Sequence, residues 1–174
     1  MFERRPAPIT PWQVPLMVVI AVQLGQRGRA RLPRRSDEMT RMIFVSLPVT
    51  ELARAQAFYE ALGFVNNPQF SDDGSACMVW SETIHVMLLT HAKWQGFTTR
   101  PIPPATASEV MLALSCESRE DVDRMNGAVA SRGGIADINP RQDLGFMYNR
   151  SFVDPDGHLW EAVWMDPAAT PPSA

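Results

Sequence analysis

The sequence predicts an α+β fold built from two βαβββ modules. Three observations support this prediction. The order of one strand, one helix and three strands occurs twice, with a period of about 65 residues. A Pro-rich segment separates the two occurrences, and glycines end both predicted helices. A hydrophobic content of 45 % over 174 residues is sufficient for a well-packed core.

The first module begins with a strand. Alternating apolar residues in MIFVSLPV (42–49) place Val45, Leu47 and Val49 on one face of that strand. The following segment has apolar residues at helical spacing and ends at Gly63, which is typical of a helix C-terminus. Three further strand candidates lie at 64–70, 75–80 and 84–91.

The second module repeats this order. EVMLALSC (109–116) alternates in the same way, with Leu112 and Leu114 on one face. The next helix is predicted to begin after Ser118, whose side chain can cap it, and to end at Gly133. The remaining strand candidates are 135–139, which is weak, 146–153 and 158–164.

These elements define the domain organisation. Residues 39–166 are predicted to form the domain, with modules at about 42–97 and 109–165, a linker at about 98–108, and a disordered tail at 167–174. Residues 1–38 do not conform to the pattern: seven Arg and three acidic residues give 7 − 3 = +4, whereas the whole chain carries −3. We interpret this segment as a disordered extension or an upstream start, with a targeting segment as the alternative.

The composition excludes several classes of function. A net charge of −3 is inconsistent with a general nucleic-acid-binding surface. The apolar run at 14–24 is about half the ~20 residues that span a bilayer, so no membrane partner is expected. Two cysteines, Cys77 and Cys116, are typical of free thiols in a reducing cytoplasm.

Three segments carry a family resemblance: LPVTELARAQAFYEALGF (47–64), the ALS strand with the helix up to RGG (113–134), and FVDPDGHLWEAV (152–163). In this order they resemble the vicinal oxygen chelate superfamily, which includes glyoxalase I, bleomycin-resistance proteins and extradiol dioxygenases. The resemblance implies a cupped mixed β-sheet with helices outside and the substrate in the cup. It also implies a homodimer, and in the metal enzymes a divalent ion held by four strands.

The four metal-ligand positions of the superfamily correspond here to Phe44, Leu88, Met111 and Glu161. Only Glu161 retains a metal-binding side chain. A catalytic zinc or iron(II) site needs about three protein ligands, so we expect no metal and no other cofactor. Strand alternation places Phe44, Ser46 and Met111 on the cup face independently of the resemblance.

The last hairpin suggests a partner for Glu161. If Asp154–Gly157 form a four-residue loop, Arg150 lies opposite Glu161 on the same face, with Tyr148 beside them. Two interpretations remain open. The pair fills a small cleft as a cross-strand ion pair, or Arg150, Tyr148 and Glu161 are the polar, catalytic groups of a ligand pocket.

The candidate ligand-binding residues are therefore Phe44, Ser46, Leu88, Met111, Tyr148, Arg150 and Glu161. The first hypothesis is a metal-independent protein that binds a small, largely apolar molecule. The second is a metal-dependent lyase, isomerase or extradiol dioxygenase. The third is a vestigial, non-catalytic protein with a filled cup. The sequence does not decide whether the protein is an enzyme.

Overall fold

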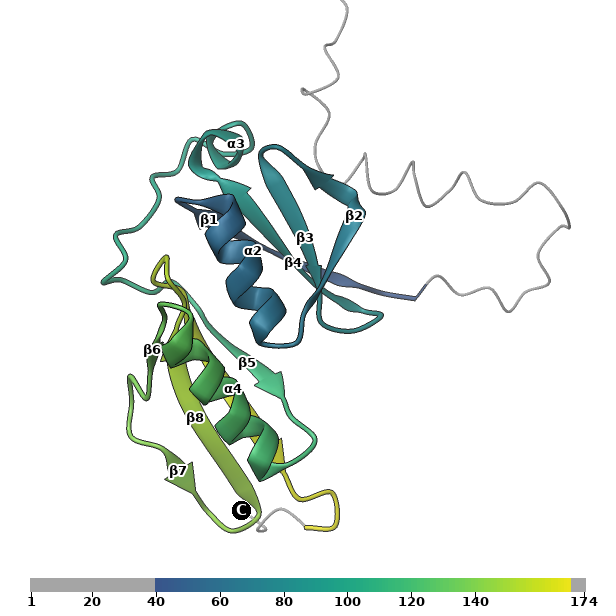
Figure 1. Ribbon diagram of the computed structural model, residues 1–174, viewed down its shortest axis with the longest axis vertical. Coiled ribbons are helices and arrows are strands. Elements are labelled where there is room, and N and C mark those ends of the chain that lie inside the picture. Colours follow the sequence, from purple (N-terminus) through teal and green to yellow (C-terminus); the bar gives the residue numbers. More distant parts are fainter. Residues whose placement is uncertain (1–39, 170–174) are drawn as a thin grey trace, which may run out of the picture. The chain divides into compact units, whose positions relative to one another are not determined.

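A computed structural model describes residues 40–169. The predicted extension at 1–38 and the end of the predicted tail lie outside these residues. Within them the α+β fold is confirmed: module one has the predicted βαβββ order, and module two has this order with one additional, unpredicted two-residue strand, β7 (Gln142–Asp143) (Figure 1). No helix between residues 40 and 169 is both long enough and apolar enough to cross a membrane.

Module one forms a four-stranded mixed sheet in the order β1-β4-β3-β2, in which β1 and β4 run parallel. Its main elements are β1 (Ile43–Val49), α2 (Leu52–Ala61), β2 (Val65–Asp72), β3 (Ser75–Val79) and β4 (Ile84–Thr90). Helix α2 lies across the strands (Figure 1) and buries Ala55, Phe58 and Tyr59 against them. The chain leaves the helix at Gly63, whose φ of +103° is readily adopted only by glycine.

A short helix follows β4 that the sequence analysis does not predict. We expected the strand to continue to residue 91, but it ends at Thr90, and α3 (His91–Gln95) begins there. The Thr90 hydroxyl accepts a hydrogen bond from the backbone N–H of Lys93, which caps the helix. In the sequence, a threonine that follows a run of apolar residues is indistinguishable from a further strand residue, so the helix start at Thr90 is not predicted.

Module two forms a five-stranded mixed sheet in the order β5-β9-β8-β6, with β7 paired to β8. Its elements are β5 (Met111–Ser115), α4 (Arg119–Ser131), β6 (Ile135–Ala136), β7 (Gln142–Asp143), β8 (Met147–Val153) and β9 (Leu159–Met165). Ser118 caps α4 as predicted, because its hydroxyl accepts from the backbone N–H of Asp121. Helix α4 buries Val122, Met125 and Val129.

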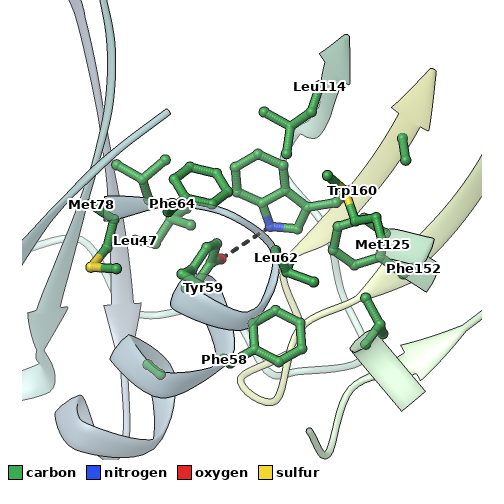
Figure 2. Packing of buried hydrophobic residues seen from close by; sticks show 14 of the residues in the cluster. Leu47, Phe58, Tyr59, Leu62, Phe64, Met78, Leu114, Met125, Phe152 and Trp160 are labelled. Carbon is green, nitrogen blue, oxygen red and sulfur yellow. Dashed lines mark hydrogen bonds between the residues drawn. The ribbon is translucent and has the colours of Figure 1, made fainter. Parts of the chain in front are cut away.

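One hydrophobic core joins the two modules. Figure 2 shows Tyr59 of module one beside Trp160 of module two, with Trp160 Nε1 donating to the Tyr59 hydroxyl at 3.1 Å. The two rings pack edge to face with their centroids 5.8 Å apart. The rings of Phe58 and Phe152 also lie side by side across the modules, with their centroids 6.5 Å apart. The apolar faces under α2 and α4 therefore contribute to a single cluster.

The DPDGH turn (154–158) fastens module two to α2 and to the end of β1 in module one. The Tyr59 hydroxyl donates to Asp154 Oδ2 at 2.7 Å, and the Thr50 backbone N–H donates to Asp156 Oδ1 at 2.8 Å. His158 Nε2 lies 2.8 Å from the carbonyl oxygen of Pro48. The conspicuous acids of this motif therefore hold the two modules together.

Candidate ligand-binding site

Each sheet has one face beneath its helix and an opposite face, which we call the cup face. In module one, strand pairing places Phe44 beside His85 and Ser46 beside Met87 on the cup face. In module two it places Met111 beside Leu159. The face is assigned by the alternate residues, such as Leu47 and Leu114, which pack into the helix-side core.

Four predicted site residues lie on the cup face as expected. Phe44 and Ser46 are half-buried in β1, Met111 is 51 % exposed in β5, and Glu161 is half-buried in β9. Glu161 pairs with Ala113 across the parallel β5–β9 ladder. The placement of these four residues is confirmed; their function is not tested by it.

The prediction that Leu88 lies at a ligand position on the cup face is wrong. Leu88 pairs with Leu47 in the parallel β1–β4 ladder, is 0 % exposed and belongs to the helix-side core. Residues that face one another in a ladder share a face, so the cup-facing neighbours are Met87 and Leu89. Because nearly every residue of β4 is apolar, the sequence does not show which of its residues share a face. The pairing of β4 with β1 shows this.

The predicted register of the last hairpin is also wrong. Val153 pairs with Leu159 instead of His158, so Arg150 faces Ala162 and Ser151 faces Glu161. The turn is one residue longer than expected, because Asp154 Oδ1 accepts the backbone N–H groups of Asp156 and His158. A shift by one residue moves every side chain of β8 to the other face.

Arg150 and Tyr148 consequently lie on the helix side, away from Glu161. Arg150 donates to Asp137 at 2.6 Å and to Asp123 at 2.8 Å, and the Tyr148 hydroxyl donates to Asp123 at 2.8 Å. The hydrogen bonds from Arg150 lower the pKa of Asp137, and that carboxylate in turn raises the pKa of Arg150. These contacts tie β8 to α4 and to the segment after β6, so the ligand pocket built on Arg150 and Tyr148 is not formed.

A second arginine fastens the loop before β8. Arg119 at the start of α4 donates to both carboxylate oxygens of Asp143, at 2.7 and 2.8 Å, and to the carbonyl oxygen of Gly145. Its guanidinium lies 5.1 Å from the Tyr148 ring and 5.2 Å from the Trp164 ring. The hydrogen bonds from Arg119 lower the pKa of Asp143 to about 2.

Glu161 has a polar neighbour that the sequence analysis missed. Asn149 Nδ2 donates to Glu161 Oε1 at 3.3 Å, and Asn149 is itself buried. Ser151 lies opposite Glu161, but its hydroxyl already accepts a hydrogen bond from the backbone N–H of Asn139. The correct turn length would have identified both residues as cup-facing.

His85 is the second missed residue. Its ring stacks on Phe44 at 4.8 Å, and its Nδ1 lies 4.0 Å from the Sγ of Cys77. Nε2 is buried and has no hydrogen-bond partner among residues 40–169. Burial raises the pKa of the Cys77 thiol to about 11, so the thiol is protonated at neutral pH.

The side chains at the metal-ligand positions do not fit a divalent ion. Replacing Leu88 by its cup-facing neighbour Met87 gives the set Phe44, Met87, Met111 and Glu161, with one carboxylate and no nitrogen donor. In the described range 40–169, no three His, Cys, Asp or Glu side chains gather in a metal-binding arrangement. Zinc, nickel, manganese and iron favour nitrogen, oxygen or thiolate ligands.

One comparison with known proteins identifies a family. A family model described as the Glyoxalase/Bleomycin resistance protein/Dioxygenase superfamily matches residues 41–162. The hypothetical protein SA1046 from S. aureus is 25 % identical, with a TM-score of 0.61 over 73 % of this chain and 95 % of that one. No curated protein matches.

Two more distant structures show the fold alone. A glyoxalase/bleomycin resistance protein/dioxygenase family enzyme from Burkholderia phytofirmans PsJN is 13 % identical, with a TM-score of 0.60 over 72 % of this chain and 99 % of that one. The fosfomycin resistance protein FosX from Listeria monocytogenes is 14 % identical, with a TM-score of 0.52 over 73 % of this chain and 94 % of that one.

Proposed function

Because the chain belongs to the Glyoxalase/Bleomycin resistance protein/Dioxygenase superfamily, we propose that it binds a small, largely apolar molecule on its cup face, without a divalent metal. The observation that carries this proposal is the set of side chains at the metal-ligand positions. Phe44 and Met111 supply apolar surface there, Glu161 supplies one carboxylate, and Met87 is fully buried and offers no nitrogen, oxygen or thiolate ligand. Apolar walls with a few polar groups are typical of small-molecule sites.

Glu161 orients the ligand in this proposal. A half-buried carboxylate is stabilised by hydrogen-bond donors, and among residues 40–169 only Asn149 donates to Glu161, at Oε1. The ligand therefore carries one hydrogen-bond-donating group on an apolar body. Asn149 fixes the carboxylate from the neighbouring strand and acts as a positioning residue.

Metal analysis and a ligand screen test the proposal together. Protein purified without an affinity tag is expected to contain no stoichiometric metal, and a thermal-shift screen of metabolites and antibiotics is expected to give apolar hits. Glu161→Gln should weaken the best hit by about tenfold, because one hydrogen bond to a charged group is weakened. Glu120→Gln is the matched control, since Glu120 is exposed on α4.

Two outcomes would contradict the proposal. Stoichiometric zinc, nickel, manganese or iron would favour a metal-dependent enzyme of the lyase or dioxygenase type. Neither metal nor ligand hits would favour a vestigial, non-catalytic protein.

We also propose that a second copy of the chain covers the Met165 end of the cup face of module two, and leaves the ligand position at Met111 and Glu161 open. Met165 is 62 % exposed, and a large apolar side chain at that exposure is well suited to a contact between subunits. Sedimentation velocity should show a dimer that Met165→Glu weakens or dissociates. Leu144→Glu is the control, because Leu144 is similarly exposed, at 58 %, in the loop before β8. A monomeric wild-type protein would overturn this proposal.

A further inference from the structure

Three side chains with nitrogen or sulfur donor atoms gather on the cup face of module one, where β3 and β4 pair. Cys77 lies directly opposite Met87 in the antiparallel β3–β4 ladder, and His85 is two residues before Met87 on the same strand. Directly opposed residues share a face, with their Cβ atoms about 4.5–5.5 Å apart, and so do residues two apart on one strand. A thiol, a thioether and an imidazole therefore occupy one small region.

The imidazole and the thiol are already separated by a distance that a metal ion can bridge. His85 Nδ1 lies 4.0 Å from the Sγ of Cys77, which is long for a hydrogen bond. Typical bonds from a metal ion are about 2.0 Å to imidazole nitrogen and about 2.3 Å to thiolate sulfur. A tetrahedral ion with these bonds holds the two atoms about 3.5 Å apart, and a linear one about 4.3 Å apart. The observed distance lies between these values and fits an ion with two or three ligands.

Hydrogen bonding leaves the His85 ring poorly satisfied. The residue is 7 % exposed, and its Nε2 has no hydrogen-bond partner among residues 40–169. Nδ1 has only the distant sulfur of Cys77. A buried polar ring with such weak partners is unfavourable. Coordination of an ion by Nδ1 supplies the strong interaction that the ring lacks.

The charge and chemistry of the three side chains favour a monovalent, polarisable ion. Only Cys77 loses a proton on coordination, so the set contributes one negative charge. Cys77 and Met87 are both 0 % exposed. A monovalent ion makes this buried site neutral, whereas a divalent ion leaves an uncompensated positive charge there. Thiolate and thioether ligands select copper(I).

We propose that Cys77, His85 and Met87 form a binding site for copper(I). The proton of the Cys77 thiol passes to water, and the thiolate, His85 Nδ1 and the Met87 thioether bind the ion. The ion is a single atom and enters from the cup, past the half-buried ring of Phe44, which stacks on His85 from the edge strand β1. The proposal does not depend on the function proposed for the cup, because Glu161 does not coordinate the ion.

Competition with the copper(I) chelator bicinchoninate, under nitrogen and with ascorbate, tests the site in the full chain. The wild-type protein is expected to take up one copper(I) per chain when the ion is supplied. Cys77→Ser should lower the affinity by more than about 100-fold, because loss of a group that merely orients a ligand already costs about 10–100-fold. Met87→Leu keeps the side-chain volume, so it should fold normally and lower the affinity by about tenfold.

Cys116→Ser is the matched control. Cys116 is the other cysteine of the chain and follows β5 in module two, so its replacement should leave the copper(I) affinity unchanged. X-ray absorption of the copper complex gives an independent readout of the ligands. We expect it to show nitrogen and sulfur neighbours of the ion and no oxygen neighbour.

Several results would overturn the proposal. These are no uptake by the wild type, unchanged affinity after Cys77→Ser or Met87→Leu, weaker binding after Cys116→Ser, or an ion without sulfur neighbours. If Cys77→Ser does not fold, Met87→Leu and the absorption spectrum decide. Glu161→Gln should leave the copper(I) affinity unchanged while it weakens the cup ligand, so the two proposals fail separately. Weaker copper(I) binding after Glu161→Gln would place the ion elsewhere in the cup and refute this site.

Discussion

Replacing Trp160 by alanine is expected to lower the free energy of unfolding by about 3–5 kcal/mol, the cost of removing a large buried aromatic side chain. Trp160 is 2 % exposed and stacks on Phe152 at 6.4 Å. Its indole N–H donates to the Tyr59 hydroxyl across the junction of the modules (Figure 2). Urea unfolding followed by far-UV circular dichroism measures the change without relying on tryptophan fluorescence.

Trp160→Phe provides the matched variant. It keeps an aromatic ring and removes the hydrogen bond, so we expect a smaller loss, of about 1–2 kcal/mol. The wild-type protein should unfold in one transition, because the core cluster contains residues of both modules. Two separate transitions, or a Trp160→Ala variant as stable as the wild type, would contradict the shared core.

Asp154→Ala is expected to lower the free energy of unfolding by about 2–4 kcal/mol, since it leaves buried donors without an acceptor. Asp154 is 4 % exposed and accepts three hydrogen bonds, from the Tyr59 hydroxyl and from the backbone N–H groups of Asp156 and His158. Chemical unfolding at neutral pH measures the loss. Asp73→Ala is the control, because Asp73 is exposed in the turn between β2 and β3.

The difference in stability between the wild type and Asp154→Ala is expected to depend on pH. Burial raises the pKa of Asp154, so the folded protein binds this proton more tightly than the unfolded chain does. The stability advantage of the wild type over Asp154→Ala should therefore be largest below the ordinary Asp pKa of about 3.9. It should decrease as the pH rises through the raised folded-state pKa. An advantage that grows with pH over this range would refute the assignment.

The cup illustrates how far sequence reasoning extends for a functional site. Phe44, Ser46 and Met111 are assigned correctly to the cup face, because β1 and β5 each alternate clearly between apolar core residues and the other face. Leu88 is misassigned, because β4 is apolar on both faces and its burial pattern carries no period of two. His85 is missed for the same reason, whereas Asn149 is missed because the predicted turn before β9 is one residue too short.

The sequence by itself determined the order of the main elements, without α3 and β7, together with the duplication, the cap at Ser118 and the end of the first helix at Gly63, because these depend on local periodicity and backbone preference. It also determined the superfamily. Only the tertiary structure decided what the DPDGH motif does: its aspartates bind Tyr59 and Thr50, more than ninety residues away along the chain.

The length of the turn between β8 and β9 shows why the faces of β8 could not be predicted from the sequence. The Asp154 carboxylate holds two backbone N–H groups of its own turn and the Tyr59 hydroxyl of the other module, which makes the turn five residues long. That one residue rotates Arg150 and Tyr148 onto the helix side and leaves Glu161 with Asn149. Side-chain contacts between distant segments set the register, and a register error of one residue reverses every face of a strand.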